Sequence, residues 1–181
     1  GPPADAQALC AALKVCQESW PWALHLLEAV GRPDVIAMSS AMTALSGAHL
    51  WQKALLLFQR LPARSRDVVS YGAAMTAAAI GKHWELGLFW LMEMKNIQLV
   101  PNLITYNAAI NACEGLHWEH ALALLETMTI VKVTPDVISY SSCIAACGQG
   151  QRWSDAMNLL DEMKQLQLQR NIIALSSAVS V

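Results

Sequence analysis

The sequence contains few charged residues. Only 14% of its 181 residues are Asp, Glu, Lys or Arg, whereas an average soluble protein has about 25%. Acidic residues outnumber basic ones by 14 to 12, so the formal net charge is −2. Proteins that bind nucleic acids are usually basic, and this balance weighs against an RNA-binding role without excluding it. The apolar share of 55% is high enough to suggest that a partner covers part of the surface.

Motifs for chemistry are absent as well. The five cysteines, an odd number without a CxxC pair, do not form a disulfide framework. No apolar run approaches the length of a transmembrane helix. The sequence has no HExxH motif, P-loop, dinucleotide-binding glycine fingerprint or Ser/His/Asp arrangement. We therefore expect a protein that is not an enzyme, with no catalytic residue, metal site, cofactor or small-molecule substrate. The chain begins at Gly1 without a presequence, which predicts a mature form or a fragment.

Tryptophan, in contrast, returns at a regular interval. The copies are separated by 31, 33, 34 and 35 residues, and they are Trp20, Trp51, Trp84, Trp118 and Trp153. Each is followed by two mostly polar residues, a small residue and an apolar run, although the copy at Trp20 is weaker. A period in this range is typical of stacked-repeat proteins, whose function usually lies on an extended surface.

Each repeat unit predicts a helical hairpin. The first helix follows an Asp or Asn that can accept hydrogen bonds from free backbone N–H groups, and small residues along it allow close approach. A turn with glycine (Gly47, Gly81, Gly115, or Gly148 and Gly150) follows, and the tryptophan opens a second helix with apolar residues at spacings of three and four. The sequence thus predicts an all-α fold with four full units at 35–67, 68–102, 103–136 and 137–171. Residues 1–34 are predicted to be a degenerate leading repeat, and residues 172–181 a trailing first helix that caps the array or begins a truncated repeat.

The starts of two units make the pattern specific. They read Leu103-Ile-Thr-Tyr-Asn-Ala-Ala-Ile-Asn-Ala-Cys113 and Val137-Ile-Ser-Tyr-Ser141. With the Ala-Leu, Leu-Leu and Met positions of the second helix and the Pro-Asp ending, residues 35–181 resemble pentatricopeptide repeat proteins. The tryptophan that opens the second helix resembles an algal subset of that family. The resemblance implies a right-handed α-solenoid of helix-turn-helix repeats that binds single-stranded RNA in an organelle, the plastid rather than the mitochondrion.

The resemblance also implies which residues contact RNA, at one base per repeat. A branched apolar residue at the second position of the first helix sandwiches the base, and these positions hold Ile36, Val69, Ile104 and Ile138. The base is chosen by the residue three further on together with the last residue of the unit. The resulting pairs are Ser39 with Asp67, Gly72 with Asn102, Asn107 with Asp136, and Ser141 with Asn171. Asn with Asp is the uridine-type pair, Ser with Asn resembles the adenine type, Ser with Asp leans toward guanine, and Gly72 has no side chain with which to read.

One feature of the family is missing. A lysine near the end of the first helix often meets phosphate, but the matching places hold no basic residue; they are Gly47, Ile80, Glu114 and Gln149. Phosphate neutralisation supplies most non-specific affinity for nucleic acid, so its loss weakens RNA binding. Two functions stay open. The first is a sequence-selective RNA-binding factor in transcript processing, stability or translation. The alternative is a scaffold subunit that binds protein within a large organellar assembly, such as a ribosome or a photosynthetic or respiratory complex, and has lost RNA binding.

Four further features have two readings each. The tryptophans are either platforms on which bases stack or, as we favour, anchors between consecutive hairpins. Three cysteines, Cys113, Cys143 and Cys147, suit tight helix packing better than a metal or redox site. Three histidines are expected in surface or capping roles; they are His83, His117 and His120. The basic cluster of Arg60, Arg64 and Arg66 is expected to be a solvated loop rather than a contact for phosphate or an acidic partner.

Overall fold

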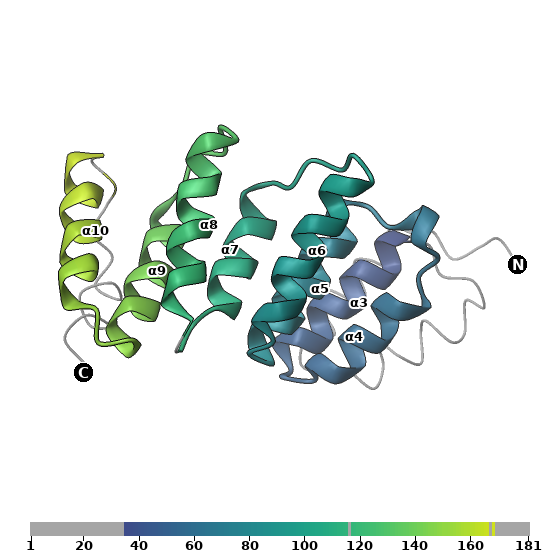
Figure 1. Cartoon of the computed structure of the whole chain (residues 1–181). Helices are drawn as coiled ribbons and strands as arrows, with labels where there is room; N and C mark the ends of the chain where they lie inside the picture. The colour runs from purple at the N-terminus through teal and green to yellow at the C-terminus, as the bar shows by residue number, and fades with distance from the viewer. Residues whose placement is uncertain (1–34, 116, 167, 169–181) are drawn as a thin grey trace, which may run out of the picture.

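The structure, a computed structural model, describes residues 35–115, 117–166 and 168. These residues form eight α-helices in antiparallel pairs, a short 3-10 helix, η2 (Ala63–Ser65), and no strand (Figure 1). The first helices of the pairs are α3 (Val35–Gly47), α5 (Val68–Ile80), α7 (Leu103–Ala112) and α9 (Val137–Gln149). The second helices are α4 (Trp51–Arg60), α6 (Trp84–Asn96), α8 (Trp118–Ile130) and α10 (Trp153–Gln165). This arrangement confirms the predicted all-α solenoid, and all four second helices begin at the predicted tryptophan. The predicted segments 1–34 and 172–181 lie outside the described residues.

Side-chain caps explain where three of the first helices begin. The last residue of each preceding unit accepts a hydrogen bond from the backbone N–H three residues on, and the hydroxyl there accepts one from the backbone N–H of the cap. These reciprocal pairs are Asp67 with Ser70, Asn102 with Thr105, and Asp136 with Ser139. Such a cap stabilises a helix by about 1 kcal/mol. The unit boundaries read from the sequence therefore coincide with capping boxes.

The first helices pack side by side through small residues. On α5 a run of alanines is buried, including Ala74, Ala77 and Ala78. Gly87 of α6 also permits a close approach, because a Cβ placed there would lie 3.4 Å from Cα of Ala109 on α7. Larger side chains recur once per unit in the core, namely the buried Tyr71, Tyr106 and Tyr140 and the buried Met94, Met128 and Met163. None of the described helices is long and apolar enough to cross a membrane.

The rings of Trp51, Trp84 and Trp118 pack against the turn of the following unit. A Cβ added to Gly81 would lie 2.8 Å from the ring of Trp51, and one added to Gly150 would lie 2.3 Å from the ring of Trp118. The backbone at Gly81 and Gly150 is not left-handed, with φ of −77° and −81°, so these glycines are needed for space and not for conformation. Gly47 and Gly148, predicted in turns, lie within α3 and α9 instead.

The unit 103–136 departs from its neighbours at its turn. Asn102 and Trp118 are 16 residues apart, whereas 17 residues separate Asp67 from Trp84. The missing residue shortens α7, which ends at Ala112. The turn then passes through Gly115 at φ 116°, a conformation that glycine adopts without strain.

Candidate nucleic-acid interface

The four predicted stacking residues are all exposed on the first helices. Their side chains are between 60% and 65% accessible: Ile36 61%, Val69 65%, Ile104 64% and Ile138 60%. Each follows the first residue of its helix, so the solenoid repeats the position from one unit to the next. A regular row of exposed branched apolar side chains does not contribute to the core, and such rows mark interaction surfaces.

Two of these residues enclose a slot. Ile104 and Ile138 line the same cavity of about 240 Å³, between α7 and its neighbours α5 and α9. The other lining residues are Thr76, Ala79, Ile80, Asn107, Ala108 and Asn111. The slot therefore has apolar walls supplied by adjacent units, and polar amide groups where Asn107 and Asn111 reach it.

The predicted pair Asn107 and Asp136 is joined by hydrogen bonds. The Asn107 amide Nδ2 donates to Asp136 Oδ1 over 3.1 Å. The Ser139 hydroxyl donates to Asn107 Oδ1 over 2.5 Å, and the Ser139 backbone N–H donates to Asp136 Oδ1 over 2.9 Å. Three side chains from two units thus fix the orientation of the Asn107 amide. One N–H of Asn107 and Oδ2 of Asp136 take no part in this network.

Asp136 is held in its ionised form. Burial alone raises the pKa of the carboxyl, but hydrogen bonds from the Ser139 backbone and the Asn107 amide outweigh it, and the pKa of Asp136 lies below its usual value. At neutral pH the carboxylate is therefore an acceptor only. Together Asn107 and Asp136 offer a donor and an acceptor side by side.

The other predicted pairs are less complete. Gly72 is buried and has no polar side-chain atom, so the exposed Asn102 has no side chain to pair with at that position. Ser39 is buried, at 2% accessibility, and its hydroxyl donates to the Val35 carbonyl. Asp67, the residue predicted to pair with Ser39, is half-buried, and its Oδ1 caps α5.

In the last pair, the Ser141 hydroxyl donates to the Val137 carbonyl, and Asn171 lies outside the described residues. Among the described units, the arrangement is therefore complete only between α7 and α9.

No basic residue lines the slot. At the place where the family often has a lysine, Glu114 is half-buried, and burial raises the pKa of its carboxyl although Lys82 opposes the shift. No other element that lines the slot supplies the row of phosphate-binding basic residues that the sequence lacks.

The contacts of the tryptophan rings favour an anchor role over base stacking. His83 lies against Trp51 at 4.8 Å between ring centroids, and the guanidinium of Arg152 lies 4.3 Å from the Trp118 ring, so the rings are occupied as anchors between hairpins. The side chains of His83 and His117 do not cap the helices they precede; they pack on tryptophan rings, as does His120.

The three described cysteines are buried in the solenoid. Burial raises the pKa of Cys113 and of Cys147 to about 11 and raises that of Cys143 further. A thiol with a raised pKa is a poor thiolate nucleophile or metal ligand at neutral pH. No group of metal-binding residues occurs among the described side chains. These features favour the packing role.

Arg66 corrects the expectation of a solvated basic loop. Its guanidinium lies 4.5 Å from the centre of the Phe58 ring and 3.6 Å from Glu93 Oε1. Both side chains of the ion pair are mostly buried, at 17% and 28% accessibility. Sequence reasoning missed this pair because the two residues belong to different elements 27 positions apart. Arg60 and Arg64 are exposed, as expected.

Comparisons with known proteins identify the class of this repeat array. The family model "Pentatricopeptide repeat domain" matches residues 65–115, and the model "PPR repeat" matches residues 138–168. Residues 65–115 and 138–168 are therefore pentatricopeptide repeats. Comparison with curated protein sequences gave no match.

Solved structures of the family share this fold. The chain is 25% identical to the pentatricopeptide repeat protein PPR10 in complex with an 18-nt psaJ RNA element, with a TM-score of 0.72, and the match covers 94% of this chain and 26% of that one. The maize PPR10 structure gives 24% identity, the same coverage and a TM-score of 0.66. The PPR domain of Arabidopsis thaliana protein-only RNase P 1 in complex with tRNA is 14% identical over 92% of both chains, with a TM-score of 0.70. This chain spans about a quarter of the length of PPR10.

Proposed function

We propose that the chain binds single-stranded RNA selectively and that the slot between Ile104 and Ile138 takes a uracil. The observation that carries this proposal is the joined pair of Asn107 and Asp136 at a slot with two exposed isoleucines. Similarity to an RNA-bound pentatricopeptide repeat protein supports it. The role is binding and not catalysis.

The chemistry of the slot suits a pyrimidine with one imino donor. The branched side chains of Ile104 and Ile138 cover the two faces of a planar base. The carboxylate of Asp136 accepts from the N3–H of uracil, and the second N–H of the Asn107 amide donates to a uracil carbonyl. Cytosine presents an acceptor at N3, which the ionised Asp136 repels. Discrimination therefore depends on the Watson–Crick edge.

The same slot predicts weak binding with a shallow dependence on salt. Each neutralised phosphate steepens the slope of affinity against salt concentration, and the slot lining contains no cation. We also propose an organellar location, the plastid rather than the mitochondrion, with a role in transcript processing, stability or translation. That part of the proposal rests on the family resemblance alone.

The test is fluorescence anisotropy with a labelled oligoadenylate that carries one central uridine. The matched probe replaces that uridine by cytidine, and titrations run from low to physiological salt. We expect tighter binding of the uridine probe, and the loss of this difference in the variant Asn107→Ala. If neither probe binds at the lowest salt, where weak electrostatic attraction is strongest, the RNA-binding proposal is wrong.

A scaffold role is the second candidate. Large apolar side chains are exposed on the second helices, for example Phe89 at 59% and Met92 at 65%. Exposed apolar groups of this kind favour protein partners over RNA. The two roles occupy different faces and are compatible in one molecule.

A further inference from the structure

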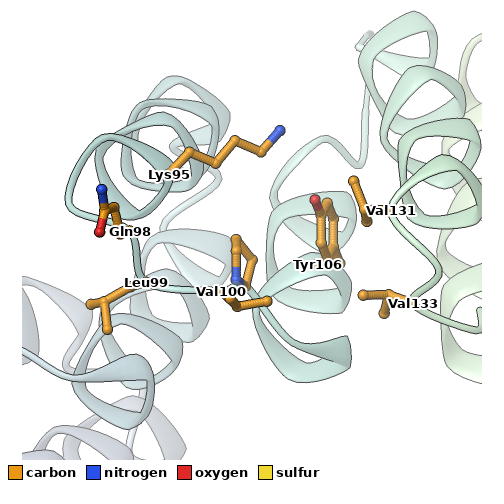
Figure 2. A pocket seen from close by; sticks show the side chains of 8 residues that line it. Lys95, Gln98, Leu99, Val100, Tyr106, Val131 and Val133 are labelled. Atoms are coloured by element: carbon orange, nitrogen blue, oxygen red, sulfur yellow. The ribbon is translucent and has the colours of Figure 1, made fainter.

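A second cavity lies away from the base slot. It has a volume of about 400 Å³ and shares no residue with the slot. It is formed by the end of α6, the segment that leads into α7, and the segment after α8 (Figure 2). The lining residues are Lys95, Gln98, Leu99, Val100, Pro101, Tyr106, Val131 and Val133. The walls are mostly apolar, and the side chains of Tyr106, Val131 and Val133 lie together on one side (Figure 2).

This cavity exists because two polar residues of the neighbouring unit are replaced. Beside Tyr71, the space is filled by Arg66 and Glu93, which interact with each other and with the phenol. Arg66 directly precedes the helix cap Asp67, and the residue directly before the next cap, Asn102, is Pro101. Glu93 is the ninth residue after the tryptophan of α6, and the ninth residue after the tryptophan of α8 is Thr127.

The following unit also keeps a polar partner for its tyrosine. Burial and the adjacent Glu162 carboxylate raise the pKa of Tyr140 to about 12. For Tyr106 the pKa is raised by burial alone. Among the three described tyrosines, Tyr106 is therefore the one without a carboxylate neighbour, and a cavity lies beside it.

The rim of the cavity is apolar and carries positive charge. Of its lining residues, Val100 is 78% accessible and Val131 is 43% accessible. Lys95 extends across the opening in Figure 2. Neither Lys95 nor the nearby Lys132 forms an ion pair with any residue that the structure describes. An apolar rim with an unpaired ammonium calls for an occupant that is apolar and acidic at once.

We infer that this cavity docks a segment of a partner protein that inserts one bulky apolar side chain and carries a carboxylate beside it. The apolar side chain occupies the space between Tyr106 and Val133. The carboxylate pairs with the ammonium of Lys95. Central apolar anchors with a charged rim are the usual composition of protein docking sites. RNA does not fit this description, because an apolar rim with isolated lysines cannot neutralise a run of phosphates.

The test uses defined peptides and the whole chain. The labelled probe is a short peptide with a Leu-Phe pair flanked by glutamates. One control replaces the flanking glutamates by lysines, and a second replaces the Leu-Phe pair by alanines. By fluorescence anisotropy, we expect both controls to bind at least about tenfold more weakly, because each loses either the charge pair or the buried side chain.

Two variants locate the binding. The double variant Pro101→Arg with Thr127→Glu places the residues of the neighbouring unit beside Tyr106, fills the cavity and abolishes binding. Lys95→Glu, an exposed substitution that leaves the fold intact by thermal melting, reverses the preference so that the lysine-flanked peptide binds better. Reversal by Lys95→Glu keeps the test decisive even if the double variant is unstable.

Three outcomes overturn the inference. Equal binding of all three peptides shows adhesion without a site. Undiminished binding to a folded filled variant shows that the peptide lies elsewhere. Self-association of the wild-type chain that the filled variant abolishes, seen by sedimentation, shows that the occupant is a second copy of this chain. RNA binding is measured on the same samples, so the two proposals succeed or fail separately.

Discussion

Units 68–102 and 103–136 are both helical hairpins, and they differ at two separate places. The first has Gly72 at its proposed base-reading position, and its Tyr71 is surrounded by Glu93 and by Arg66 of the preceding unit. The second has the joined pair of Asn107 and Asp136 but an open cavity beside Tyr106. The helical hairpin fixes the position of each residue. Single side chains at these positions then account for the two differences between the units.

The largest effect is expected where the interior is filled. Glu93→Ala leaves the guanidinium of Arg66 mostly buried without its carboxylate, which should lower the free energy of unfolding by about 2 kcal/mol, less than for a fully enclosed pair. Urea unfolding measures this change. The matched control is Thr127→Ala in the next unit, for which we expect well under half that loss. Equal losses at the two positions would mean that the ion pair does not distinguish the units.

Replacing Asn107 by glycine should make unit 103–136 resemble unit 68–102 at the proposed base-reading position. Asn107→Gly takes away the amide that donates to Asp136, so the preference for uridine over cytidine should fall by about tenfold, the effect of one well-placed pair. The measurement is anisotropy with the two oligoadenylate probes. Asn111→Ala, on the same slot, is the control and should lower affinity for both probes alike.

Installing a reader in the first unit is the reverse experiment. A Cβ at Gly72 meets Ile104 Cγ2 at 3.7 Å and Thr105 Cγ2 at 3.8 Å, which are ordinary contacts, so Gly72→Asn should fold with unchanged or slightly higher stability. Paired with Asn102, it should add a second base preference of a few-fold. Titration with probes that vary the base adjacent to the uridine detects it. A fall in thermal stability would show that the space beside α7 is smaller than these distances indicate.

The smallest effect concerns the two caps and pH. The folded-state pKa of Asp136 is lowered, so its contribution to stability is present above its unfolded value and is lost as pH falls through the folded one. The cap Asn102 does not titrate. Asp136→Asn should therefore flatten the acid limb of a stability profile measured by urea unfolding, whereas Asn102→Asp should steepen it. Parallel profiles for the two variants would contradict this assignment.

Much of the fold could be predicted because each hairpin is encoded locally. Tryptophan positions, Asp and Asn caps and apolar spacing all act within about one helix. Within the described residues, the tryptophans and the three capping residues stand at observed helix starts. The family resemblance, and not the periodicity, pointed to Ile36, Val69, Ile104 and Ile138, all of which are exposed.

Contacts between units were harder to predict. Arg66 with Glu93, Trp118 against Gly150, and the burial of Ser39 all depend on how one hairpin seats on the next. Periodicity gives the repeat but not this seating. The cavity beside Tyr106 was missed for the same reason, since it arises from two substitutions in separate elements. Comparing Pro101 and Thr127 with their counterparts across units would have been the available signal.

The contacts of Trp51, Trp84 and Trp118 with the next turn make the molecule its own optical sensor. Indole emission responds to neighbouring imidazole and guanidinium groups, and Trp118 is covered by Arg152 and by the turn at Gly150 only when the following hairpin is seated. A chain in which Trp118 is the sole remaining indole would report the undocking of its C-terminal neighbour, and one that retains Trp51 would report the junction at His83. Fluorescence can therefore reveal in which order the array comes apart, one joint at a time.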